Sequence, residues 1–195
     1  TTQQQVLSLF AGAALGLQPT TDIAGISWSA ILKNVYAMLF GVADEMGLGD
    51  NLRGYLAATA LQELSAIVAG LGGHPATPYG LAGLGDLITT ATSRGSHHHE
   101  LGRRLVRGGT EALHGEGIHA LQSVRQHALF EWRRYPLWAL TARLVAEPEL
   151  LPTARVSAPP TSLRRSLPWM STRQGGVRPP RARPASRRPC PAPDR

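Results

Sequence analysis

The sequence predicts an all-α helical bundle domain followed by a disordered basic tail. Apolar residues recur at three- and four-residue steps through residues 27–46, and the same spacing returns in four later segments. Alternation of the kind that strands need is found only weakly, in the first 26 residues. With 195 residues, 43% of them hydrophobic, the chain can form one packed core and is too short for a two-domain enzyme.

The first expected helix lies within residues 27–46. Its apolar stripe consists of Trp28, Ile31, Leu32, Val35, Met38, Leu39, Val42 and Met46. Gly47 and Gly49 end it, and Asp50 is the expected N-cap of a second helix that continues to the glycines at 70–73. These two helices are expected to form a hairpin, and helical spacing resumes at residues 101–106, 118–124 and 137–145.

Residues 74–86 (HPATPYGLAGLGD) are expected to form a structured loop with one short helical turn, because prolines and glycines interrupt them. The glycine spacing is G-x-x-G-x-G with no strand ahead of it, so a Rossmann phosphate loop is rejected. Glycines that let helices or a substrate approach the backbone are the better interpretation. On its own, Asp86 is favoured as a cap of the next helix rather than as a catalytic group.

Charge divides the chain near residue 150. Residues 1–150 carry 10 basic and 12 acidic side chains, whereas residues 151–195 carry 10 arginines against Asp194 alone. Pro, Arg, Ala and Gly make up 27 of those last 45 residues, which predicts disorder. A nucleic-acid arm is disfavoured because aromatic interleaving is absent apart from Trp169. A solvated tail is favoured, and an out-of-frame end of a GC-rich gene would give the same composition.

The cysteine content, the apolar runs and the N-terminal residue indicate the cellular environment expected for the protein. A single cysteine, Cys190, excludes a disulfide framework and a thiolate metal site. No apolar run reaches the roughly 18–20 residues that cross a bilayer, so we expect no membrane span and a reducing, cytoplasmic setting. The start at Thr1, without a methionine or a signal peptide, predicts a piece of a longer chain.

Lys33 is the first candidate for chemistry, since it is the only lysine beside 19 arginines and lies within the first helix. A lysine can give up its proton in a partly buried site and an arginine cannot, so proton transfer would require lysine here. An ordinary surface lysine is the alternative. Ser96-His97-His98-His99 does not predict a metal site, because adjacent helical residues diverge by about 100°. A serine ahead of a helix start could instead bind an anion.

These signals occur in an order that resembles the C-terminal, substrate-binding domain of bacterial NAD(P)-dependent glycerol-3-phosphate dehydrogenase. Residues 20–25 (TTDIAG) and 31–35 (ILKNV) resemble its strand exit and lysine-asparagine helix, and residues 41–51 (GVADEMGLGDN) continue the match. Residues 80–90 (GLAGLGDLITT) are similar to its second signature. The resemblance covers about residues 5–147 and implies a helical domain like the C-terminal domain of 6-phosphogluconate dehydrogenase.

The resemblance implies roles for the candidate residues. Lys33 would take the proton from the C2 hydroxyl of sn-glycerol 3-phosphate as hydride leaves for NAD or NADP, with support from Asn34. Asp86 and Thr90 would contact the substrate beside the lysine.

The resemblance also implies a phosphate site and a cofactor contact. Ser96 matches the start of the phosphate-binding run, in which His97 and His98 replace the usual arginine and asparagine. His97 and Glu116 would reach the cofactor. A histidine cannot make the bidentate fork of arginine, which bears on affinity, and it is only partly charged near neutrality, so phosphate binding is expected to depend on pH.

The implied organisation has three parts. Residues 1–26 are a remnant of the junction to a missing Rossmann domain, 27–150 are the substrate-binding domain, and 151–195 are the tail. The chain is expected to be inactive without the cofactor-binding part, and a homodimer is left open. The alternatives are a related two-domain dehydrogenase for another hydroxy acid, and a non-catalytic interaction module whose arginine-rich tail binds anionic partners.

Overall fold

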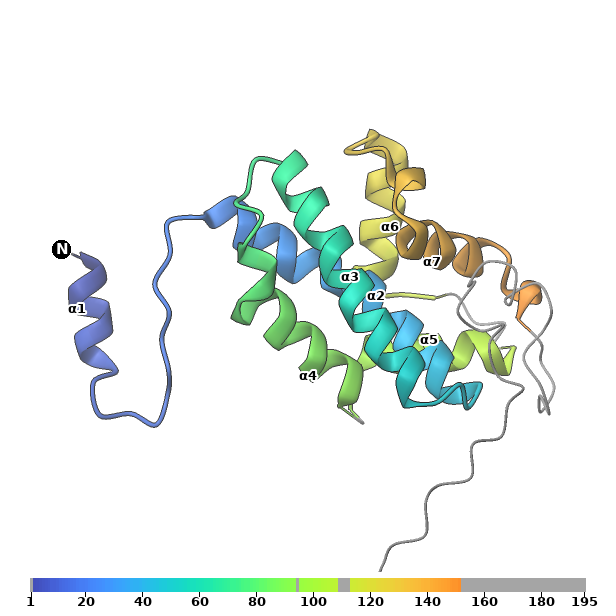
Figure 1. The fold of residues 1–195 in the computed structure, drawn as a ribbon, viewed down its shortest axis with the longest axis horizontal. Coiled ribbons are helices and arrows are strands. Elements are labelled where there is room, and N and C mark those ends of the chain that lie inside the picture. The colour runs from blue at the N-terminus through green and yellow to red at the C-terminus, as the bar shows by residue number, and fades with distance from the viewer. Residues whose placement is uncertain (1, 94, 109–112, 152–195) are drawn as a thin grey trace, which may run out of the picture. The chain divides into compact units, whose positions relative to one another are not determined.

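The computed structural model describes residues 2–93, 95–108 and 113–151, and every regular element in these ranges is a helix (Figure 1). The all-α class is therefore confirmed. The α-helices are α1 (Thr2–Leu9), α2 (Ile23–Glu45), α3 (Asp50–Gly70), α4 (Asp86–Thr92), α5 (His97–Arg107), α6 (Glu116–His127) and α7 (Pro136–Ala146). Four short helices join them: η1 (Thr77–Tyr79), η2 (Leu81–Gly85), η3 (Trp132–Arg134) and η4 (Pro148–Leu150).

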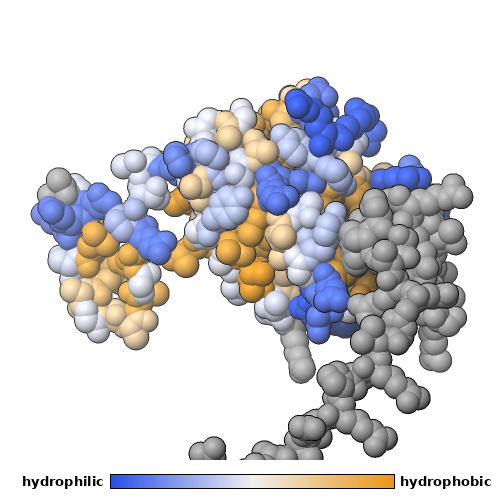
Figure 2. Space-filling model, in the orientation of Figure 1, coloured by the Kyte–Doolittle hydropathy of each residue, from blue (hydrophilic) through white to orange (hydrophobic). Residues whose placement is uncertain are grey.

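Residues 2–26, the described part of the N-terminal segment, contain no strand, so the weak alternation there does not predict one correctly. Residues 2–9 form α1, which buries none of its side chains, and Val6, Leu9 and Leu15 are 47%, 81% and 56% exposed. Figure 2 shows apolar side chains gathered on this N-terminal segment. Alternation over so few residues is a weak signal when no neighbouring strand is present to pair with.

Helix α2 is the central element of the domain. Asp22 begins it, because its carboxylate accepts the Gly25 N–H at 2.9 Å and also the N–H of His74 at 2.9 Å. The Thr77 hydroxyl also donates to this carboxylate, and that hydrogen bond, followed by those from His74 and Gly25, lowers the pKa of Asp22. From Leu32 to Ala43 every residue is buried, so the expected single apolar stripe is wrong for this stretch. Helices α3, α4, α5, α6 and α7 all pack against α2, which leaves it no solvent face there.

The length and composition of α2 would allow it to cross a membrane, contrary to the expectation that no apolar run is long enough. In this structure 61% of its most apolar window is buried inside the domain. A core helix that is surrounded by other helices has the same composition, and that is how α2 is used here.

Two glycines bring α2 and α5 into backbone contact. A Cβ added at Gly41 would overlap the carbonyl oxygen of His99, and one added at Gly102 would overlap that of Met38. A similar close backbone contact occurs in the loop, where a Cβ added at Gly83 would overlap the carbonyl oxygen of Pro78. The expected close approach within residues 74–86 is therefore confirmed, although that segment forms a 3₁₀ turn and a π turn rather than one helical turn.

A buried carboxylate on α3 anchors the first turn of α7. Glu63 on α3 is 5% exposed and accepts the N–H groups of Leu137 at 2.8 Å and Trp138 at 3.1 Å, in the first turn of α7. It also accepts the Tyr36 hydroxyl at 3.0 Å. Burial raises the pKa of Glu63, while the two backbone hydrogen bonds act in the opposite direction. One side chain thus joins α2, α3 and α7.

Leu151 is the last residue that the structure describes. That residue is 2% exposed, one position past the boundary expected at 150. Contacts divide the chain into residues 1–159 and 160–195, and the second unit lies wholly outside the described residues. The expected disordered tail therefore also lies outside them, apart from Leu151.

Candidate functional site

The amino group of Lys33 is the centre of the candidate site. The side chain projects from the buried middle of α2 and is 10% exposed. Its Nζ donates to the Thr90 hydroxyl at 2.6 Å and lies 2.9 Å from Asp86 Oδ1. The interpretation of Lys33 as an ordinary surface lysine is therefore wrong. A buried cation with two oxygen partners on one neighbouring helix is held in a defined position.

Helix α4 supplies both partners of the lysine. Asp86 and Thr90 are four residues apart, so they share one face of the helix. Thr90 donates its hydroxyl proton to the Asp86 carbonyl at 2.7 Å, which leaves its oxygen free to accept from Lys33. Asp86 does not cap α4, because Gly85 occupies the N-cap and no side chain caps that end. Its carboxylate turns instead to the lysine and remains 45% exposed.

Asn34 points to a different helix from its neighbour Lys33. It is 2% exposed, and its Nδ2 donates to Glu116 Oε2 at 2.8 Å, at the first residue of α6. Its Oδ1 is buried with no hydrogen-bond partner among the described residues. Glu116 itself is exposed. The side-chain amide therefore fixes one acidic group and retains an unused acceptor.

His98 connects α5 to α6 beside these residues. Its Nε2 accepts the Gly117 N–H at 3.3 Å, and a Cβ added at Gly117 would lie 2.9 Å from the Asn34 carbonyl oxygen. Burial lowers the pKa of His98, and the charges of His97 and Lys33 act in the same direction. A ring nitrogen that accepts a backbone N–H is unprotonated, so His98 is neutral in this arrangement.

Ser96 and His97 occupy the start of α5. Ser96 is the N-cap, and its Oγ accepts the His99 N–H at 3.3 Å, as expected for a serine ahead of a helix. His97 is exposed, and its Nε2 lies 2.7 Å from the His114 carbonyl oxygen. Its ring packs edge-on against His98, with centroids 5.6 Å apart. The three residues therefore occupy one helix end, but His97 and His98 are each held by a separate backbone group.

His99 has a role that the sequence did not reveal. It is 7% exposed, and its Nε2 lies 2.8 Å from Asp44 Oδ2 on α2. Arg53 of α3 pairs with the same carboxylate at 3.3 Å. These contacts anchor the first turn of α5 to α2, and no spacing signal could have found partners 55 residues apart. The described residues hold no group of three or more histidines, cysteines or acids arranged to bind a metal.

Comparisons with known proteins agree on one family. The family model described as the NAD-dependent glycerol-3-phosphate dehydrogenase C-terminus matches residues 22–149. A glycerol-3-phosphate dehydrogenase [NAD(P)+] of Thermus thermophilus is 40% identical over 116 residues, which are 59% of this chain and 36% of that protein. A relative of the same description in Dehalococcoides mccartyi is 39% identical over 107 residues, 55% of this chain and 30% of that protein.

A solved structure shares the fold. The crystal structure of glycerol-3-phosphate dehydrogenase from Coxiella burnetii aligns with a TM-score of 0.59 and 26% identity, over 76% of this chain and 50% of that one. The chain thus spans about a third of the length of the curated relatives and half of that solved chain. Since the family model covers most of the described residues, this chain belongs to the family of C-terminal domains of NAD-dependent glycerol-3-phosphate dehydrogenase.

Proposed function

We propose that this chain is the substrate-binding and catalytic part of an NAD(P)-dependent glycerol-3-phosphate dehydrogenase, which interconverts sn-glycerol 3-phosphate and dihydroxyacetone phosphate. The observation that carries the proposal is the Lys33 amino group held between Thr90 and Asp86, at 2.6 and 2.9 Å. Such a group can exchange a proton with a substrate hydroxyl placed at the open side of Asp86.

The contacts support the proposed roles of these residues. Lys33, in its neutral form, takes the proton of the C2 hydroxyl, and the Asp86 carboxylate stabilises the ammonium that results. The exposed part of Asp86 accepts a hydrogen bond from a glycerol hydroxyl. Thr90 orients Lys33, because its own proton is committed to the Asp86 carbonyl. The catalytic residues in this proposal are Lys33 and Asp86, with Thr90 and Asn34 beside the substrate.

The phosphate group is proposed to bind at the start of α5. Ser96 and His97 lie there with backbone N–H groups of the first helical turn, which attract anions. His98 contributes no charge while it accepts the Gly117 N–H, so its role is limited to its remaining ring nitrogen. Of the two histidines at this helix end, His97 is then the one that would supply positive charge to the phosphate, unlike the expectation that both supply it.

The cofactor would meet this chain at the start of α6. The Asn34 Oδ1, which is buried without a partner, and the exposed Glu116 carboxylate are both acceptors. Acceptors fit the amide and hydroxyl donors of a nicotinamide nucleotide, NAD or NADP, and they do not fit its phosphates. When bound, the nicotinamide accepts a hydride. His97 stands at the neighbouring helix end, where it could also contact the cofactor.

The proposed organisation keeps the division expected from the sequence. Residues 27–150 would form the substrate-binding domain, residues 1–26 the junction to a cofactor-binding domain, and residues 151–195 the basic tail. Without a cofactor-binding domain the chain would bind substrate and not turn it over. The rival in which the arginine-rich tail binds anionic partners depends on residues outside the described ones. A cytoplasmic location and a homodimer remain proposals.

The test is a fusion of residues 22–195 behind the part of the Thermus thermophilus relative that precedes its matched region. The Lys33→Arg variant keeps the charge and should lower turnover of glycerol 3-phosphate by about 10²- to 10⁴-fold, the usual contribution of a general base. Thr90→Val should lower turnover less, because it only orients the lysine.

The matched control is Thr89→Val. Thr89 is the exposed neighbour in α4 and makes the same type of hydrogen bond, to the Gly85 carbonyl at 2.9 Å, without touching Lys33. Turnover of Thr89→Val should equal that of the unmodified fusion. Near-normal turnover of Lys33→Arg would refute the proposal, and preference for a hydroxy acid without phosphate would favour the related dehydrogenase instead.

A further inference from the structure

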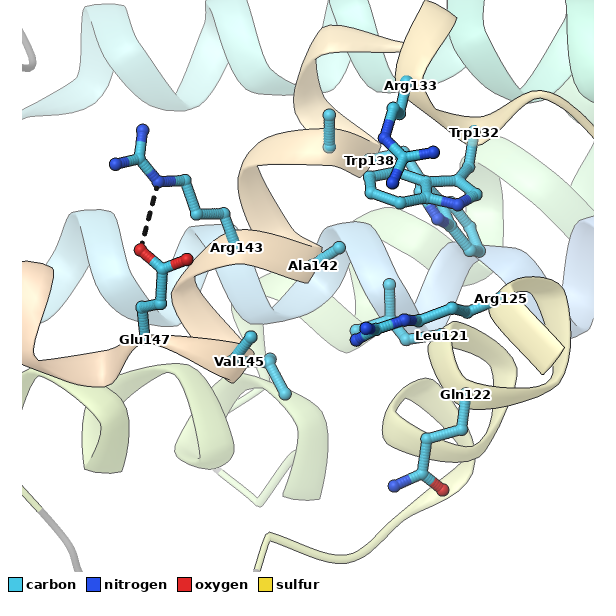
Figure 3. Close-up of a pocket in the computed structure, with 12 residues that line it drawn as sticks. Leu121, Gln122, Arg125, Trp132, Arg133, Trp138, Ala142, Arg143, Val145 and Glu147 are labelled. Atoms are coloured by element: carbon cyan, nitrogen blue, oxygen red, sulfur yellow. Dashed lines mark hydrogen bonds and ion pairs between the residues drawn. The ribbon is translucent and has the colours of Figure 1, made fainter.

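A cleft of about 620 Å³ lies between α6, η3 and α7, away from the Lys33 site (Figure 3). Its floor is apolar and is formed by Leu121, Trp138, Ala139 and Ala142. Trp138 is 1% exposed and is fixed by its backbone hydrogen bond to Glu63. None of the candidate site residues lines this cleft. Its volume falls within the range of roughly 300–1,000 Å³ that is usual for small-molecule sites.

Three arginines from three different elements surround this apolar floor. Arg143 of α7 pairs with Glu147 at 3.5 Å, and Figure 3 shows both side chains at one end of the cleft. Arg133 of η3 lies over the Trp132 ring, 4.4 Å from its centroid. Arg125 of α6 lines the same cleft and is labelled in the same view. Within the described residues no carboxylate pairs with Arg125 or Arg133, and the lining therefore carries two uncompensated positive charges.

This combination selects a particular ligand chemistry. A guanidinium is the side chain best suited to bind phosphate or carboxylate oxygens through paired N–H donors. The indole of Trp132 and the apolar floor would bury a ring or a short hydrocarbon body. We infer that the cleft between α6 and α7 binds a small organic anion that carries an aromatic or aliphatic body, its acidic group facing Arg125 and Arg133 and its body lying against Trp132 and the apolar floor.

The test uses the full chain and phenyl phosphate as the probe, with inorganic phosphate as the anion that has no apolar body. The protein has four tryptophans, whose indole N–H signals can be followed separately in a ¹⁵N-labelled sample. Phenyl phosphate should shift the signals of Trp132 and Trp138 in a saturable way and leave that of Trp28 unchanged. Inorganic phosphate at the same concentration should shift neither cleft signal.

Variants localise the binding. Arg125→Gln and Arg133→Gln should each weaken phenyl phosphate binding by about two- to five-fold, the size expected of an exposed ion pair. Arg134→Gln is the matched control, because Arg134 is exposed in the same short helix and does not line the cleft. The basic tail is common to all variants, so its contribution cancels. Equal weakening by Arg134→Gln, equal shifts with inorganic phosphate, or unchanged Trp132 and Trp138 signals would each overturn the inference.

Discussion

Lys33 and Asn34 are consecutive residues whose side chains contact different helices. Lys33 contacts Asp86 and Thr90 on α4, whereas Asn34 contacts Glu116 on α6. Adjacent positions on a helix diverge by about 100°, so two neighbours can face two different packing partners when the helix is surrounded. Because α2 is central, this dipeptide places the proposed proton-transfer group, Lys33, next to the proposed cofactor contact, Asn34.

The lowered pKa of His98 predicts how the stability of the folded chain depends on pH. Its pKa is lowered from 6.5, so the unfolded chain binds a proton first as the pH falls. The stability that the neutral His98 ring contributes is fully present above about pH 6.5, the pKa of histidine in the unfolded chain. It is lost as the pH falls through the lower pKa of His98 in the folded chain. Protonation also removes the acceptor of the Gly117 N–H. The free energy of unfolding should therefore fall less between pH 7.5 and 5.5 in His98→Asn, whose amide can still accept that hydrogen bond.

The control for this experiment is His119→Asn, since His119 is an exposed histidine of α6. Urea unfolding at the two pH values, followed by circular dichroism, measures each difference. His119→Asn should show the pH dependence of the unmodified chain. If His98→Asn shows the same dependence too, His98 does not exchange a proton on unfolding in this range.

The crossing of α2 and α5 depends on glycine at two positions. Gly41 and Gly102 lie on opposite helices, and each is covered by a backbone carbonyl of the other helix. Backbone atoms cannot rotate away as a side chain can, so any Cβ must push the helices apart. The separation would also strain the His99–Asp44 contact, which lies at the same crossing.

Gly41→Ala should therefore lower the free energy of unfolding by about 1–3 kcal/mol or more, the usual cost of overpacking. Gly54→Ala is its control, because nothing lies within 4 Å of the added Cβ in α3. Alanine is the better helix former, and this control should raise stability by about 0.5–1 kcal/mol. Urea unfolding distinguishes the two signs, and a neutral Gly41→Ala would show that the helices separate without loss.

The described domain is one helical unit whose parts are held together by contacts distant in sequence. Glu63 ties α7 to α3, Asp44 ties α5 to α2, and Leu151 buries its side chain at the end of the described chain. Residues 152–195 contain few apolar side chains that could add to a core. The boundary between a packed domain and a solvated segment is accordingly proposed to follow Leu151.

Truncation after Leu151 should leave the melting temperature within a few degrees of that of the full chain, because the removed residues are rich in proline and arginine. Leu151→Ala in the full chain should instead lower stability by about 2–5 kcal/mol, as expected for a buried leucine. Thermal unfolding by circular dichroism measures both. A large drop on truncation would mean that the tail packs on the domain.

Helix positions could be predicted from the sequence because they depend on local spacing. Residues 27–46 and 50–70 have apolar positions every three or four residues and glycines at their ends, and α2 and α3 occupy these ranges to within a few residues. One boundary detail was wrong: Gly49, with φ of 81°, is the N-cap of α3, and Asp50 is its first residue. A glycine can adopt that conformation without strain, so the helix begins there.

Lys33 could be selected from composition because it is a lone lysine on an apolar helix. Its partners could not be derived from spacing, since Thr90 is 57 residues away and only a resemblance pointed to it. Packing decided that Asp86 faces Lys33 instead of capping α4, that His98 accepts a backbone N–H, and that Arg125 and Arg133 border one apolar cleft. Periodicity is a property of a single helix, whereas the identity of the groups that meet across helices depends on how all the helices pack together.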